Sequence, residues 1–192
     1  MPISNQKILY IFCCLVFSLT LTIAPVELAS SSRSPAYNED GSLNWQYLLD
    51  VGQRCGGGIS RELLLAIMWV ESRMNPYAVN VNGVGGFMPS SPRRALEIIH
   101  RYNRANTDIG LMQVNYRWWG EEFQIRKVDL LNPSRNICIG AKILRQYLED
   151  HNWSWRGIGR YNAVSPDKQV AYAKRVLRAY EKIKQIKANL PH

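Results

Sequence analysis

Signals for the start of a helix recur along this sequence, and they constrain the fold more than any other feature. Ser60 precedes an apolar stretch with helical spacing, and Ser154 opens a further segment. Ser91 and Ser165 are each followed by a proline, which places a capping serine before a proline at the first helical position. Residues 136–148 repeat apolar side chains on one helical face. The pattern predicts a mainly α domain.

One segment interrupts this helical pattern. Asn82 and Gly83 lie between two arms that contain valine, and an Asn-Gly pair in that setting is the strongest short signal for a β-hairpin. Residues 105–115 show no periodicity and are predicted to form a loop. We therefore predict a mainly α (α+β) fold with one small β-hairpin, placed just after a helix that runs from residue 61 to about residue 74.

The first residues differ in composition from the rest of the chain. Lys7 is followed by an almost uncharged apolar run, residues 8–24, which is the layout of a secretory signal peptide. Because the run is only a little shorter than the roughly 20 residues that span a bilayer, an uncleaved anchor is the alternative. We predict a signal peptide or anchor over residues 1–29, a Ser-rich linker over residues 30–43 and the folded domain over residues 44–190.

Export would make the chain periplasmic, with no membrane contact beyond an uncleaved N-terminal segment. Cys55 and Cys138 would then be the only cysteines of the mature chain, and an oxidising compartment favours joining them. Two buried free thiols are the alternative, because spacing alone does not determine pairing. The three histidines are scattered and no CxxC motif is present, so neither a metal site nor a cofactor is predicted.

The formal net charge of +9 indicates attraction to polyanions. Nucleic acid, anionic lipid and the bacterial wall all fit this charge, and export removes nucleic acid from the expected partners. The helix predicted to begin at Ser165 carries lysines and arginines mostly on one side. It is interpreted as a core helix with a solvated basic face, and contact with the wall or a membrane is the alternative.

Glu71 is the most unusual residue, because it ends an apolar helical stretch that begins at Leu63. Helical spacing places it next to Ile67, one turn back. A carboxyl group pressed against an apolar face is poorly solvated and holds its proton more tightly, as a general acid requires near neutral pH. On this pattern alone, a glutamate at a helix end usually faces water or an arginine, here Arg73.

Three segments strengthen the interpretation of Glu71. Residues 69–76 (WVESRMNP), 110–115 (GLMQVN) and 160–163 (RYNA) resemble, in this order, three motifs of the soluble lytic transglycosylase (SLT) domain. The similarity covers roughly residues 45–184 and implies a lysozyme-like fold with a groove for a glycan strand between two lobes. The third motif departs from the family pattern, because alanine, valine and serine follow the asparagine where glycine is usual.

The resemblance also implies roles for individual residues. Glu71 would be the catalytic acid and base, with the Tyr161 hydroxyl against its carboxylate. Gln113 and the backbone around Met112 would line the groove. The expected substrate-binding residues are Ser72, which has the weakest claim as a support of the helix end, together with Met112, Gln113, Tyr161 and Asn162.

The implied reaction is cleavage of the β-1,4 bond between N-acetylmuramic acid (MurNAc) and N-acetylglucosamine (GlcNAc), with a 1,6-anhydro product and no water consumed. Residues 80–106 are longer than in compact family members. Their Asn-Gly turn and Pro-containing loop, with the lead into the second motif, resemble transglycosylases that accompany conjugation and secretion systems, which implies partners in an envelope-spanning machine. Two alternatives stay open. One is a hydrolytic lysozyme that uses Asp108 as its second carboxylate, and the other is a non-catalytic wall-binding assembly subunit.

Overall fold

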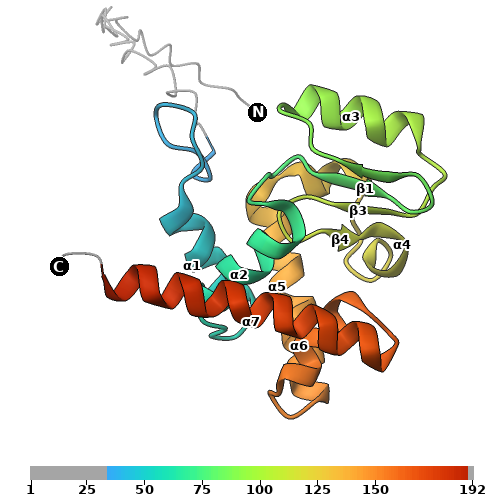
Figure 1. Cartoon of the computed structure of the whole chain (residues 1–192). Helices are drawn as coiled ribbons and strands as arrows, with labels where there is room; N and C mark the ends of the chain where they lie inside the picture. The colour runs from blue at the N-terminus through green and yellow to red at the C-terminus, as the bar shows by residue number, and fades with distance from the viewer. Residues whose placement is uncertain (1–33, 190–192) are drawn as a thin grey trace, which may run out of the picture. The chain divides into compact units, whose positions relative to one another are not determined.

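Five helices pack on one another in the computed structural model, which describes residues 34–189 (Figure 1). Helix α1 packs on α5, and α2 packs on α7. Helix α6 contacts both α5 and α7. The bounds of these helices are Trp45–Cys55 for α1, Arg61–Ser72 for α2, Pro133–Asp150 for α5, Trp155–Asn162 for α6 and Pro166–Ala188 for α7.

The helix starts predicted at Ser60, Ser91, Ser154 and Ser165 are confirmed, while the helix predicted over residues 136–148 begins three residues earlier, at Pro133. The Ser60 side chain accepts a hydrogen bond from the Leu63 amide (3.2 Å) at the beginning of α2. The Ser91 side chain caps α3 (Pro92–Arg101), and α7 begins directly after Ser165. Helix α2 ends two residues earlier than expected, because Arg73 adopts a left-handed conformation with φ 52°.

A small antiparallel sheet lies beside this helical part (Figure 1). The predicted hairpin is confirmed as β1 (Val79–Val81) and β2 (Gly85–Phe87). The sheet also contains β3 (Thr107–Ile109) and β4 (Val114–Asn115), in the order β2-β1-β3-β4. The prediction of a plain loop over residues 105–115 is therefore wrong, because β3 is stabilised by pairing with the distant β1 and has little signal of its own.

Short elements connect the sheet to the helices. Helix α3 joins β2 to β3, while α4 (Tyr116–Trp119) and the 3₁₀ helix η1 (Lys127–Leu131) join β4 to α5. Within the described residues, no helix is both long enough and apolar enough to cross a bilayer.

The segment before α1 corrects the predicted linker. Ala36 is fully buried, and Tyr37 forms an isolated β-bridge with Leu43. Residues 34–43 therefore pack as part of the domain, which begins about ten residues earlier than expected. The signal peptide or anchor predicted over residues 1–29 lies outside the described residues.

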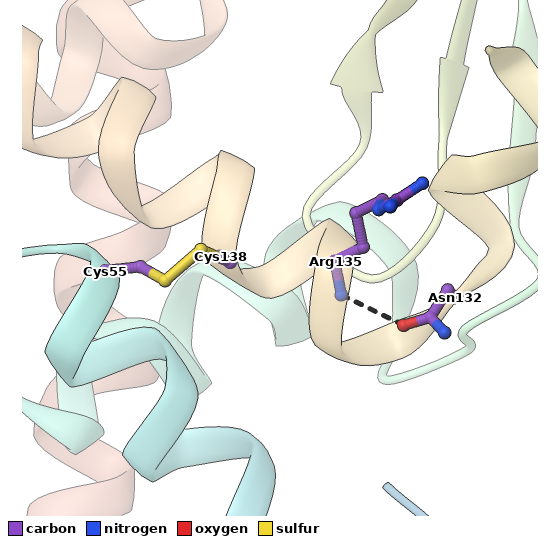
Figure 2. The surroundings of a disulfide bond; sticks show 4 residues. All are labelled: Cys55, Asn132, Arg135 and Cys138. Carbon is purple, nitrogen blue, oxygen red and sulfur yellow. Dashed lines mark hydrogen bonds between the residues drawn. A yellow bond between two sulfur atoms is a disulfide. The ribbon is translucent and has the colours of Figure 1, made fainter. Parts of the chain in front are cut away.

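Helix α5 runs through the core, with Ile137 and Leu144 fully buried. A disulfide joins Cys138 of this helix to Cys55 at the end of α1, with their Cα atoms 5.1 Å apart (Figure 2). The same figure shows the start of α5, where the Asn132 side chain accepts a hydrogen bond from the Arg135 amide. The bridge spans 83 positions of sequence and connects the first helix to the central one.

Candidate active site

Glu71 opens into a cavity of about 620 Å³. Its lining comes from the end of α2, the sheet, α4, α5, and α6 with the residues that follow it. The residues that line it are Glu71, Ala78, Val79, Asn80, Asn82, Gly86, Phe87, Met88, Asn106, Asp108, Gln113, Val114, Asn115, Trp118, Trp119, Ile143, Tyr147, Arg160, Tyr161, Asn162, Ala163 and Val164. The cavity is therefore large enough for sugar residues and is mixed in polarity.

The Glu71 carboxyl group lies in an environment that favours its neutral form. Ile67 and Met68, one turn back on α2, are fully buried beneath it. Burial raises the pKa of Glu71 to about 7, against a hydrogen bond from Tyr172 that lowers it. The negative charge of Asp108 raises the pKa and the positive charge of Arg175 lowers it, both with smaller effect. Glu71 is thus poised to give and to take a proton near neutral pH.

The tyrosine that contacts Glu71 is not the expected one. The Tyr172 hydroxyl donates to Glu71 Oε1 at 2.6 Å, and the Arg175 guanidinium lies 5.4 Å from the centre of the Tyr172 ring. The Tyr161 hydroxyl instead donates to the carbonyl oxygen of Met112 at 2.8 Å. The reason is that Tyr172 belongs to α7, which packs directly on α2. Tyr161 still lines the cavity, on α6.

The second motif forms a tight turn around a buried asparagine. Gly110 has φ 85°, and a Cβ atom there would lie 2.2 Å from Asn136 Nδ2, so only glycine fits. Asn136 donates to the carbonyl oxygens of Ile109 and Leu130, and its Oδ1 accepts from the Met112 amide at 2.8 Å. The buried Asn136 side chain of α5 therefore holds the loop in place through hydrogen bonds to backbone groups of the protein.

Two expected substrate-binding residues do not reach the cavity. Met112 is fully buried, and its amide and carbonyl groups are bonded to Asn136 and Tyr161. Ser72 is also buried, and its hydroxyl donates to the carbonyl of Leu111 (2.8 Å) or of Met68 (3.0 Å). Both residues thus support the site through contacts inside the protein, and Ser72 ties α2 to the second motif.

Gln113 and Asn162 do line the cavity, as expected. Gln113 has φ 46°, and its side-chain amide donates to the carbonyls of Ala78 (3.1 Å) and Gly110 (2.9 Å). Its side-chain oxygen has no partner within residues 34–189. Trp118 lines the same cavity with 73% of its surface exposed, and such a flat apolar ring suits stacking on a sugar.

Asp108 belongs to the sheet face of the cavity. Its neighbours across the strands are Asn80 of β1 and Asn115 of β4. Asn80 donates to Asp108 Oδ2 at 2.8 Å, and Asn115 donates to Oδ1 at 2.6 Å. Two amides thus hold the carboxylate in the cavity that contains Glu71, so the cavity brings together the acid and the second carboxylate that the sequence singled out.

Sequence reasoning missed the roles of Tyr172 and Asn136. Asn136 is a polar residue on the otherwise apolar face of α5, one turn before Gly140, and that break in the pattern was the available signal. Tyr172 had no such signal. It lies on the buried side of α7, where a tyrosine is equally suited to plain core packing.

A helix-borne glutamate with a pKa raised to about 7, which opens into a cavity beside a small antiparallel sheet, is the arrangement of the lysozyme-like class of domains. Residues 52–183 match the transglycosylase SLT domain family, and the chain belongs to that family.

Several named proteins are similar to this chain. Invasion protein IagB of Salmonella typhi is 32% identical over 137 residues, which cover 68% of this chain and 73% of IagB. X polypeptide of Escherichia coli is 30% identical over 138 residues, 67% of this chain and 70% of its own length. Protein IpgF of Shigella sonnei is 28% identical over 132 residues, 65% of this chain and 74% of IpgF. No solved structure matches.

Proposed function

We propose that this protein is a peptidoglycan lytic transglycosylase, which cleaves the β-1,4 bond between MurNAc and GlcNAc. The observation that carries the proposal is Glu71, an acid with a pKa of about 7 that opens into a cavity lined by exposed aromatic and amide side chains. An acid of that strength is substantially protonated near neutral pH and still able to give up its proton.

The proposed reaction has two proton transfers, both at Glu71. The acid protonates the glycosidic oxygen as the bond to C1 of MurNAc breaks, with assistance from the N-acetyl group of the same sugar. The ionised Glu71 then removes the proton of the MurNAc 6-hydroxyl as that oxygen attacks C1, which closes the 1,6-anhydro ring and restores the acid. Tyr172 stabilises the ionised form between the two transfers by its hydrogen bond to Oε1.

The test is the Glu71→Gln variant, assayed by mass spectrometry of muropeptides released from purified wall. The amide keeps the shape but cannot donate the proton, so release of 1,6-anhydro products should stop. Glu62→Gln is the matched control, because Glu62 lies on the same helix, pairs with Lys187 and does not line the cavity. A Glu71→Gln protein that is folded by circular dichroism and still releases anhydro products would refute the proposal.

The placement of Asp108 favours a second candidate, a hydrolytic lysozyme. Two carboxyl groups in one cleft are what hydrolysis of a glycosidic bond usually requires. The ends of the products separate the two functions, since hydrolysis leaves reducing ends and the transglycosylase reaction leaves anhydro ends. Under our proposal, Asp108 serves to stabilise the positive charge that develops at C1. Asp108→Asn should therefore slow the reaction without changing the anhydro product.

We also propose that the enzyme is exported and opens the wall locally for an envelope-spanning conjugation or secretion apparatus. The apolar N-terminal run supports export, and the similarity to a protein named for invasion supports the link with such an apparatus. Deletion of the chain's gene should impair assembly of the apparatus, and the Glu71→Gln form should not restore it. Restoration by the inactive form would instead support the non-catalytic assembly role.

A further inference from the structure

Arg160, in the last turn of α6, is a positive charge on the wall of the cleft without a negative partner. It is half-buried, and among residues 34–189 it is the one lysine or arginine that lines the cavity. No ion pair in this part of the chain includes it. An anionic ligand that contacts a partly buried cation offsets part of the cost of removing that cation from water.

The guanidinium group is nevertheless held in place. Arg160 Nη1 donates to the Ala163 carbonyl at 3.3 Å, and the group lies 5.4 Å from the centre of the Tyr147 ring. Gln169 fixes the same turn, because its amide donates to the carbonyls of Ala163 (3.1 Å) and Val164 (2.9 Å). The guanidinium group of Arg160 is therefore fixed in place, yet most of its five N–H donors have no acceptor within residues 34–189.

The two carboxyl groups of the cleft do not provide the missing partner. Both oxygens of Asp108 already accept hydrogen bonds from Asn80 and Asn115. Glu71 accepts from Tyr172 and is close to half protonated near neutral pH. A cation near the C-terminal end of a helix is favourable by itself. That effect explains a positive charge on the last turn of α6, but not why the charge lines the cavity.

We propose that Arg160 binds a carboxylate of the glycan strand and thereby selects its muramic residue. The inference rests on the proposed function for the identity of the strand. In peptidoglycan the carboxylates belong to the muramic residue, on its stem peptide or, where the peptide is absent, on its lactyl group, and GlcNAc has none. A planar guanidinium with free parallel donors is the side chain best suited to a carboxylate. Arg160 thus positions the strand so that a muramic residue occupies the cleft of Glu71.

The test measures binding and does not depend on turnover. The Glu71→Gln protein is titrated calorimetrically with glycan strands, with and without stem peptides, and with the same strands after conversion of their carboxylates to methylamides. The Arg160→Gln substitution is then introduced into the same Glu71→Gln protein. It removes the charge and keeps an amide that is able to donate to the Ala163 carbonyl. Arg156→Gln is the matched control, because it removes the same charge one turn earlier on α6, at an exposed position outside the cleft.

The protein that keeps Arg160 should bind the carboxylate strand with a Kd about tenfold lower than that for the methylamide strand, as expected for a charge-assisted hydrogen bond. Arg160→Gln should bring this ratio close to one, Arg160→Lys should retain part of it, and Arg156→Gln should preserve it. A ratio seen with peptide-free strands assigns the lactyl carboxylate. A ratio confined to strands with peptides assigns the stem.

Three outcomes would overturn the inference. The preference for carboxylate strands could be the same with Arg160 and with Arg160→Gln, or Arg156→Gln could lose it as fully as Arg160→Gln does. The protein with Arg160 could also fail to distinguish the two strands. A folded Arg160→Lys form without any preference would do the same if Arg160→Gln does not fold. The proposed function fails separately, if the wild-type protein releases no anhydro ends from strands that it binds with the expected preference.

Discussion

At the scale of single residues, the proposed chemistry depends on the proton affinity of Glu71. Its pKa is raised to about 7, mainly by burial. The first step uses the acid form, so the rate of anhydro release should fall as the pH rises through about 7. Initial rates on purified wall between about pH 5 and about pH 9 provide the check. A rate that stays flat across neutral pH would show that protonated Glu71 is not the acid.

The same shift predicts how stability depends on pH. The folded protein binds the Glu71 proton more tightly than the unfolded chain, whose pKa stays near 4.5, so stability is lost as the pH rises from about 4.5 to 7. Glu71→Gln removes this loss and should be more stable than wild type by roughly 3 kcal/mol above pH 7, with no such advantage below about pH 4. Urea unfolding at the two pH values measures the difference. An advantage that does not change with pH would contradict the assignment.

The two tyrosines of the site should behave differently when each loses its hydroxyl. Tyr172→Phe removes the bond that stabilises ionised Glu71, so the pKa of Glu71 should rise further and the fall in rate should move to higher pH. A bond to a charged group is worth about 1.5 to 3 kcal/mol, so turnover should drop by roughly tenfold or more. Tyr161→Phe is the control, since it loses a bond to the Met112 carbonyl and should leave the pH midpoint unchanged. Equal pH profiles for both variants would show that the Tyr172 hydroxyl does not affect the protonation of Glu71.

At the scale of secondary-structure elements, the first turns of α5 determine how firmly the second motif is held. Asn132 and Asn136 are one turn apart on this helix. Asn132 makes one capping bond at the start of the helix, while Asn136 makes two bonds to the loop around Gly110 and a third to the Leu130 carbonyl of η1. Asn132→Ala should cost about 1 kcal/mol, as for loss of a helix cap.

Asn136→Ala should cost several times as much, about 3 kcal/mol or more, because buried backbone groups lose their partners. It should also lower activity, since the loop that carries Gln113 loses its support. Urea unfolding of the two alanine variants gives the comparison. Equal losses of stability would show that the buried contacts add nothing beyond an ordinary cap.

At the scale of the whole molecule, the Cys55–Cys138 bridge joins α1 to α5. A closed loop of this length is worth about 4 to 5 kcal/mol in the chain-entropy model. Replacing both cysteines with serine should therefore lower the melting temperature by roughly 10 °C. Exported protein should also resist alkylation unless it is reduced first. Labelling of both thiols in non-reduced, denatured material would contradict the bridge.

The net charge of +9 also acts at this scale. Most of the basic side chains of α7 are exposed, so their attraction to an anionic wall is screened by salt. The fraction of protein that sediments with purified wall should fall as salt is raised. Undiminished sedimentation at high salt would indicate that the cleft, and not the charge, holds the protein on the wall.

Local chemistry explains which features could be predicted from the sequence. The Ser60 and Ser91 side chains cap their helices within one turn, and the Asn82-Gly83 turn needs only its own backbone conformation. The apolar setting of Glu71 follows from helical spacing. For these features the determining interactions lie within a few residues, so the helices, the hairpin and the position of the acid could be deduced in advance.

The remaining features depend on which segments meet in space. Strand β3 exists because β1 lies beside it, and Tyr172 bonds Glu71 because α7, a hundred residues later, packs on α2. Ser72 and Met112 belong to matching motifs, yet the fold buries them as supports. The sequence alone determined the helices, the turn and the catalytic candidate through short-range geometry. Only the tertiary structure decided the partners of Glu71. The spacing of apolar residues shows which side of a helix is buried, but it does not show which other element packs on that side.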